Sequence, residues 1–131
     1  MSHKSLKTAL ALRELAEGRW GPKRHWRCVY CGRGAGMVLD HLWPSALGGT
    51  DHISNLFPAC DRCNGSKHDL DPWAWMTAVG VPERRQDAIR TLIAYPDLKP
   101  KPVPNQRFAL DYDAAKALEA PKGSFQGQKG K

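Results

Sequence analysis

Two Cys-x-x-Cys pairs constrain this chain more than any other feature of its sequence. The pairs are Cys28/Cys31 and Cys60/Cys63, and 28 residues separate them. Each pair presents two thiolates from one tight turn, and four thiolates satisfy tetrahedral zinc without a water ligand. Four-cysteine zinc sites usually have about 15–20 residues between the pairs, but this longer insert has room for a strand, a loop and a second strand. We therefore predict a closed, structural zinc site.

The length and composition of the chain favour one small domain stabilised by metal. A chain of 131 residues builds only a modest core, so a structural zinc ion is a useful stabiliser. No apolar run approaches the length that spans a bilayer, and the first residues soon reach the charged side chains of Arg13, Glu14 and Glu17, unlike a secretory signal. We expect a cytoplasmic, reducing compartment, where cysteines favour metal over disulfides.

The net charge of +7 is concentrated at the two ends of the chain. Residues 1–27 hold seven basic residues against two acidic ones, and residues 99–131 hold seven against three. The middle, residues 28–98, holds six basic residues against eight acidic ones. Basic arms around a slightly acidic centre fit a polyanionic partner together with a divalent cation. The alternative is that the basic ends only keep a small protein soluble.

The hydrophobic pattern predicts an α+β fold with three parts. Residues 1–27 form a basic N-terminal helix and connector, residues 28–98 form the core, and residues 99–131 form a Pro/Lys/Gly-rich tail that we expect to be flexible. Periodicity and turn residues predict strands over 37–43 and 55–58, and helices over 5–18, from residue 61, over 72–79, over 82–95 and over 112–120.

The stretch between and beside the cysteine pairs resembles the HNH endonucleases, the family built on the ββα-metal motif. The matching motifs, with a glycine turn at Gly48-Gly49-Thr50, are Asp40-His41, Asn55-Leu56 and Cys60-x-x-Cys63-Asn64-x-x-Lys67. They cover about a third of the chain, and the rest carries no family signal. The resemblance implies a small ββα-metal core with zinc knuckles, packed by flanking helices.

The resemblance also implies a catalytic role for each polar residue of these motifs. His41 is the expected general base, Asp40 and Asn64 are expected to hold one Mg²⁺ or Mn²⁺ ion, and Asn55 is expected to brace the loop between the strands. Imidazole suits proton transfer near neutral pH, and oxygen ligands suit these cations. His68 lies one helical turn after Asn64 and is either a third metal ligand or a surface histidine.

Strand geometry adds a condition to this assignment. Side chains alternate along a strand, so Asp40 and His41 point to opposite faces. Because both converge on one metal-centred site in the family, we predict a twist or a bulge at this point.

Basic side chains near the motif are candidates for contacts with nucleic acid. They are Arg24, Arg27, Arg62 and Lys67. The predicted function is metal-dependent hydrolysis of DNA phosphodiester bonds. The alternatives are a non-catalytic four-cysteine zinc module that binds nucleic acid, and a degenerate nuclease kept as a scaffold. Small proteins of this pattern resemble those of phages and mobile elements, which implies a bacterial or phage-infected cell and a larger DNA-processing or packaging assembly as partner.

Overall fold

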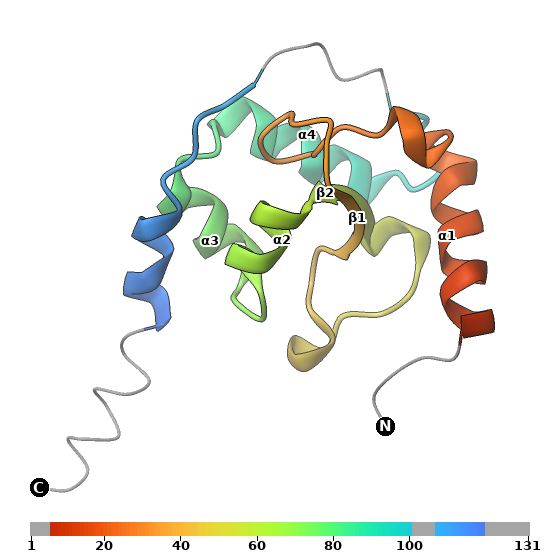
Figure 1. Cartoon of the computed structure of the whole chain (residues 1–131), viewed down its shortest axis with the longest axis horizontal. Helices are drawn as coiled ribbons and strands as arrows, with labels where there is room; N and C mark the ends of the chain where they lie inside the picture. Colours follow the sequence, from red (N-terminus) through yellow and green to blue (C-terminus); the bar gives the residue numbers. More distant parts are fainter. Residues whose placement is uncertain (1–5, 101–106, 120–131) are drawn as a thin grey trace, which may run out of the picture.

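The centre of the molecule is a two-stranded antiparallel hairpin followed directly by a helix (Figure 1). The computed structural model describes residues 6–100 and 107–119. Strand β1 (Met37–His41) pairs with β2 (Leu56–Cys60), and helix α2 (Asp61–Lys67) follows β2. The predicted α+β class and the ββα order are therefore confirmed. Strand β1 ends two residues before its predicted end, and β2 continues two residues beyond its predicted end.

Helices flank this hairpin on both sides (Figure 1). Helix α1 (Leu6–Trp20) packs against β2, and α2 packs against both strands. Helices α3 (Pro72–Val79) and α4 (Glu83–Ala94) complete the cover. Short 3-10 helices occur at Lys23–His25, Ser45–Leu47, Ile53–Asn55 and Tyr112–Ala115. Within residues 6–100 and 107–119, no helix is long and apolar enough to cross a membrane.

Local sequence chemistry explains the bounds of α3. The side chain of Asp71 accepts hydrogen bonds from the backbone N–H groups of Trp73 (2.9 Å) and Ala74 (3.1 Å), which caps the helix. Pro72 occupies the first turn, where its missing N–H costs nothing. Gly80 ends the helix with a φ of 91°, a left-handed conformation that favours glycine. The predicted helix over 72–79 is confirmed with these bounds.

Aromatic side chains fill the core beneath the hairpin. Tyr30, Phe57 and Trp75 are fully buried, and the Tyr30 and Trp75 rings meet edge-on with centroids 5.1 Å apart. Trp20 and Trp26 donate their indole N–H groups to the carbonyl oxygens of Leu56 (3.1 Å) and Gly21 (2.7 Å), respectively. These two tryptophans pack inside the fold.

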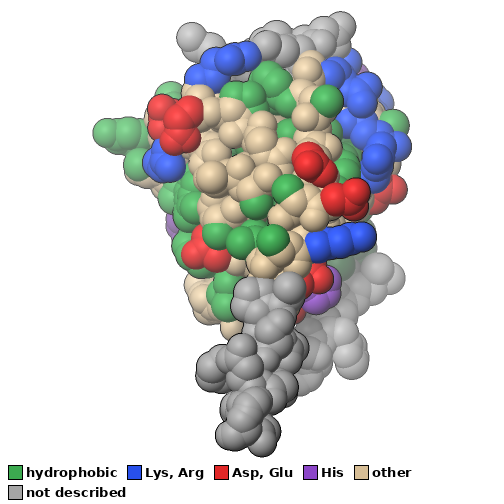
Figure 2. Space-filling model, turned by 90° about the vertical axis from the view of Figure 1, so that its left-hand side faces the viewer, with side chains coloured by type: hydrophobic (Ala, Val, Ile, Leu, Met, Phe, Trp, Pro, Cys, Tyr) green, Lys and Arg blue, Asp and Glu red, His purple; other side chains and the backbone are tan. Residues whose placement is uncertain are grey.

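The chain returns to the cysteine turns after residue 106. The backbone N–H of Phe108 donates to the Cys31 carbonyl (2.9 Å), and that of Asp111 donates to the Val79 carbonyl (2.9 Å). Ala115 is 2% exposed and belongs to the core. Seen from the side of α3 and this segment, hydrophobic side chains lie among charged ones of both signs (Figure 2). Residues 107–119 are therefore part of the packed body, which the expectation of a flexible tail did not anticipate. The expected linker at 101–106 and the end of the tail at 120–131 lie outside the described residues.

Candidate active site and zinc centre

The four cysteines gather into one buried cluster. Their Sγ atoms all lie within 4.8 Å of one another, and those of Cys31 and Cys60 are 3.7 Å apart. All four residues are buried, between 0% and 5% exposed. Four thiol sulfurs at this spacing are the donor set of a structural zinc site, with no position left for water. The residues present therefore fit a zinc ion.

Backbone hydrogen bonds shape the two turns around the sulfurs. Cys28 Sγ accepts from the N–H groups of Tyr30 (3.4 Å) and Cys31 (3.5 Å), and Cys60 Sγ accepts from Cys63 N–H (3.4 Å). Cys60 thereby also caps α2. Hydrogen bonding with Cys28 lowers the pKa of the thiols of Cys31 and Cys60. Hydrogen bonding within the cluster raises the pKa of the Cys28 thiol in return. Because zinc binds thiolates, binding of the ion would release the protons that the cluster holds.

A tyrosine from the 107–119 segment contacts this cluster. Tyr112 Oη lies 3.1 Å from Cys63 Sγ, and the Arg62 guanidinium lies 5.3 Å from the centroid of the Tyr112 ring. A hydroxyl that donates to a metal-bound sulfur stabilises its negative charge. The sequence analysis missed Tyr112, because a proline-rich stretch separates it from the motif and nothing local signals its return.

His41 is held by a carboxylate that the sequence analysis also missed. His41 Nε2 lies 2.8 Å from Asp51 Oδ1, and the two side chains are 22% and 44% exposed. His41 comes from β1 and Asp51 from the loop between the strands. A carboxylate on one ring nitrogen fixes the tautomer and the orientation of the imidazole. The one feature of the sequence that could have pointed to Asp51 is its place as an acidic residue directly after the glycine turn.

Asp40 lies in a different environment, buried between two donors. Tyr30 Oη donates to Asp40 Oδ2 (2.5 Å), and Lys67 Nζ lies 3.3 Å from Asp40 Oδ1. Lys67 also donates to the carbonyl oxygens of His41 (3.1 Å) and Leu42 (3.0 Å). Burial raises the pKa of Asp40, while Lys67 and Tyr30 act in the opposite direction. Burial also raises the pKa of Tyr30, whose hydroxyl therefore keeps its proton and donates it.

The burial of Lys67 does not fit the predicted phosphate contact. Its side chain is 1% exposed, and its ammonium group is surrounded by three oxygen partners inside the protein. In this arrangement Lys67 ties α2 to the end of β1 and balances the charge of Asp40.

Of the predicted twist or bulge between Asp40 and His41, the bulge is absent. The five residue pairs of β1 and β2 are consecutive, from Met37 opposite Cys60 to His41 opposite Leu56. The regular alternation of the strand is therefore kept, and the two side chains meet different partners on opposite faces. The contact between His41 and Asp51 forms without a bulge, because Asp51 approaches His41 from the loop.

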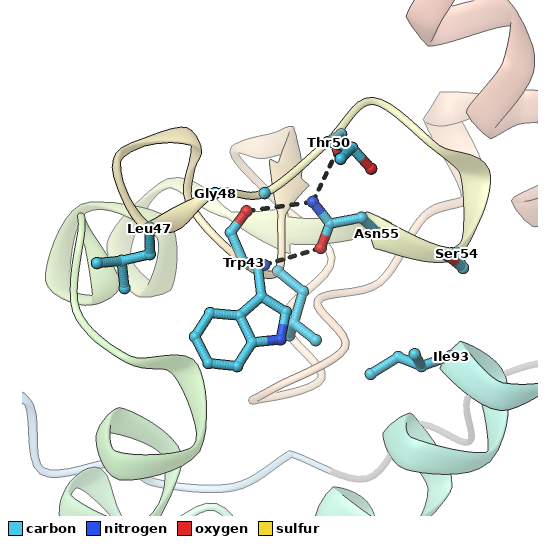
Figure 3. A pocket seen from close by; sticks show the side chains of 9 residues that line it. Trp43, Leu47, Gly48, Thr50, Ser54, Asn55 and Ile93 are labelled. Atoms are coloured by element: carbon cyan, nitrogen blue, oxygen red, sulfur yellow. Dashed lines mark hydrogen bonds between the residues drawn. The ribbon is translucent and has the colours of Figure 1, made fainter.

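Asn55 braces the loop between the strands (Figure 3). Its Oδ1 accepts from the Trp43 N–H (2.8 Å), and its Nδ2 donates to the carbonyls of Trp43 (3.1 Å) and Thr50 (2.8 Å). At Gly49 an added Cβ would lie 1.7 Å from the Trp43 carbonyl oxygen, so only glycine fits. A cavity of about 410 Å³ opens between this loop and Ile93 of α4.

The remaining predicted metal ligands lie on or after α2. Asn64 is exposed on α2. His68 caps the C-terminus of α2 with its side chain 72% exposed, and its Nδ1 lies 3.5 Å from Asp69 Oδ2. This position agrees with the alternative of a surface histidine. The Asp40 carboxylate and the Asn64 amide oxygen suit Mg²⁺ or Mn²⁺ by their chemistry. Both Asp40 oxygens already have protein partners, so an ion there must compete with Lys67.

The predicted nucleic-acid contacts differ in their surroundings. Arg24 is exposed in the 3-10 helix Lys23–His25, and Arg62 is exposed beside Tyr112. Arg27 is half-buried, and its Nη1 donates to the Gly32 carbonyl (2.9 Å), so this guanidinium supports the first zinc knuckle.

Comparison with known proteins found a family likeness for one segment of the chain. Residues 28–77 match a family model described as HNH endonuclease. Neither a curated protein nor a solved structure gave a significant match to the chain. The matched residues hold both cysteine pairs, the two strands, α2 and most of α3. Residues 28–77 of this chain are thus similar to an HNH endonuclease domain.

Proposed function

We propose that this protein is a metal-dependent endonuclease that hydrolyses phosphodiester bonds of DNA, with His41 as the general base. The observation that carries the proposal is the Asp51–His41 hydrogen bond, within a segment that matches the HNH endonuclease family. A partly exposed histidine fixed by a carboxylate is what proton abstraction from water requires.

In this proposal the Asp51 contact assigns a role to each nitrogen of the His41 ring. With the Asp51 carboxylate accepting the Nε2 proton, Nδ1 carries the lone pair and takes the proton from water. The negative charge of Asp51 then stabilises the imidazolium that forms. Asn55 holds the loop that carries Asp51, and Lys67 holds the carbonyl oxygen of His41 itself. Base and partner are thus positioned from two sides.

The zinc ion and the catalytic ion have separate places in this proposal. Zinc would be held by the four cysteines and would stabilise the fold. Mg²⁺ or Mn²⁺ would be held by Asp40 and Asn64, in competition with Lys67 for the Asp40 carboxylate, and would neutralise charge at the phosphate and at the leaving oxygen. His68 could bind this ion only if its ring moved away from the Asp69 carboxylate.

The test is cleavage of supercoiled plasmid by the full chain with added Mg²⁺ or Mn²⁺. His41→Ala should lower the cleavage rate on the order of 10²–10⁴-fold, the usual contribution of a positioned general base. Zinc content, thermal unfolding and DNA binding should stay near those of the wild type. His25→Ala is the matched control, because His25 is exposed in the 3-10 helix Lys23–His25.

Two outcomes would overturn the proposal. If His41→Ala cleaves DNA at the wild-type rate, His41 is not the general base. A wild-type protein that binds DNA and never cuts it with any divalent cation would be a zinc module that binds nucleic acid.

A further inference from the structure

A cavity between α1 and β1 opens beside His41. Its volume is about 260 Å³, and its lining includes His41 together with Leu39 of β1, Arg13 of α1 and Lys23 of the 3-10 helix that follows. None of Arg13, Lys23 and Leu39 belongs to the HNH motifs, and Arg13 and Lys23 precede the matched segment. The N-terminal part of the chain therefore contributes to the surroundings of the candidate base.

We propose that this cavity binds a sugar-phosphate segment of the nucleic acid strand, with Arg13 and Lys23 contacting a backbone phosphate next to the bond that is cut. The inference rests on the proposed function, because it takes His41 as the reacting base. It adds a substrate subsite and assigns it to Arg13 of α1 and to Lys23.

The charge around the cavity favours an anion. Arg13 and Lys23 bring two positive charges, and Glu17 is the acidic group bonded to both: its Oε2 lies 3.5 Å from Arg13 Nε and accepts from the Lys23 N–H (2.8 Å). That backbone hydrogen bond lowers the pKa of Glu17, so it is ionised and offsets one of the two charges. Glu17 also holds both basic residues at the cavity. The side chain of Arg13 is 51% exposed and open to a ligand.

The volume and the apolar lining of the cavity favour one unit of a strand over a free small molecule. Small-molecule sites usually measure about 300–1,000 Å³, and this cavity is smaller. Ala9, Leu12 and Trp26 line it beside the two cations. Apolar side chains next to cations suit the sugar and the phosphate of a nucleic acid backbone, which are contacted without reading sequence.

The charge test measures DNA binding as a function of salt in a His41→Ala background without added divalent cation. Cleavage then cannot interfere. Arg13→Gln and Lys23→Gln should each weaken binding and reduce the slope of log affinity against log salt by roughly 0.9 for duplex or 0.7 for single-stranded DNA. Matched controls are Arg90→Gln and Lys116→Gln, which replace exposed cations paired with Asp87 and Asp113. A slope unchanged relative to the controls would overturn the proposal.

A second variant fills the cavity without changing charge. Ala9→Phe adds a ring to a lining residue, and it should weaken binding at every salt concentration with the slope unchanged. Ala11→Phe is the matched control, because Ala11 is exposed on α1 and does not line the cavity. Equal affinity of these two variants, with equal helical content by circular dichroism, would exclude the cavity as a binding site.

Kinetics separate this proposal from the proposed function. In the otherwise wild-type protein, Arg13→Gln should raise KM with little change in kcat, because it removes binding and leaves the base in place. If the wild type binds but does not cut, loss of binding in Arg13→Gln still supports the subsite. If the wild type cuts and neither Arg13→Gln nor Lys23→Gln changes KM, the subsite fails and the nuclease assignment stands.

Discussion

At the scale of single residues, Asp40 and His41 leave β1 in opposite directions and meet different partners. Asp40 is 3% exposed and contacts Tyr30 and Lys67, whereas His41 is partly exposed and contacts Asp51. Each side chain is therefore controlled by residues far from it in sequence. Substitutions of these partners separate support for the base from support for the fold.

Asp51→Asn should reduce cleavage by weakening the hold on His41. The amide keeps the size of the side chain but removes the negative charge that stabilises the imidazolium. We expect kcat to fall about 10–100-fold, the range seen when the partner that orients a ligand histidine is replaced, with KM and thermal unfolding close to those of the wild type. Steady-state kinetics on a labelled oligonucleotide measures this.

The control for this change is Asp87→Asn, which removes an exposed carboxylate that pairs with Arg90. Asp51→Glu should recover part of the activity, because it restores the charge. If kcat is unaffected in Asp51→Asn, the carboxylate does not position the base.

Lys67→Met should destabilise the protein, since it leaves the buried carboxylate of Asp40 without its cation. Breaking a buried ion pair from one side costs about 3–5 kcal/mol. Adding Asp40→Asn to this variant should restore part of the loss, because no buried charge then remains. Urea unfolding of both variants, with exposed Lys116→Met as the control, measures the effect.

The pH dependence of the same variant has a definite sign. The folded pKa of Asp40 is raised, so the stability that this carboxyl contributes is present below its unfolded pKa and is lost as the pH rises through the folded pKa. Removing Lys67 removes an interaction that favours the ionised form, which enlarges this loss. The stability difference between the wild type and Lys67→Met should therefore grow from acidic to neutral pH. A difference that does not vary with pH would indicate lost packing alone.

At the scale of elements, sequence predicted what local chemistry determines. The capping Asp71, Pro72 and Gly80 set the bounds of α3, and the cysteine pairs placed two turns around one cluster. The path of the loop between the strands was not predictable in this way. It depends on two hydrogen bonds that the Asn55 side chain donates, on one that it accepts, and on the close approach of Gly49 to Trp43, all of which are tertiary contacts. For the same reason the sequence pointed to His41 and missed Asp51.

Tyr112→Phe should weaken zinc binding, because it removes the hydroxyl beside Cys63 Sγ and keeps the ring that Arg62 contacts. Losing one such partner of a metal ligand typically costs 10–100-fold in affinity. Competition with a chromogenic chelator measures the zinc affinity, and elemental analysis of the wild type should give about one zinc per chain. Tyr95→Phe, at a position 64% exposed, is the control. Equal zinc affinities for Tyr112→Phe and the wild type would contradict this role.

At the scale of the whole molecule, helix α1 and the segment 107–119 each join parts of the fold that are distant in sequence. Arg19 of α1 donates through Nη2 to the carbonyls of Leu92 (2.6 Å) and Tyr95 (3.1 Å) at the end of α4. The segment 107–119 contacts Cys31 through the Phe108 N–H and Cys63 through the Tyr112 hydroxyl. Periodicity indicated the short helix in this segment but could not show where it packs. The proline-rich stretch before it carries no local signal for the direction that the chain takes.

Shortening the chain tests this role of the C-terminal segment. A chain that ends at residue 106 loses two backbone hydrogen bonds to the body, the buried Ala115 and the Tyr112 hydroxyl. A chain that ends at residue 119 keeps all of them and loses only Lys122, Lys129 and Lys131 among the basic residues.

We expect the chain ending at 106 to lose roughly 3–5 kcal/mol of unfolding free energy, from the lost hydrogen bonds and apolar burial, and to release zinc more readily. The chain ending at 119 should unfold like the full chain. Its DNA binding should show a lower salt slope, since three lysines that can neutralise phosphates are gone. Urea unfolding and binding titrations on both chains measure the two effects separately. If the chain ending at 106 proves as stable as the full chain, residues 107–119 contact the cysteine cluster without stabilising the fold. If the chain ending at 119 binds DNA with the same salt slope as the full chain, the phosphate contacts come from residues 1–119 alone.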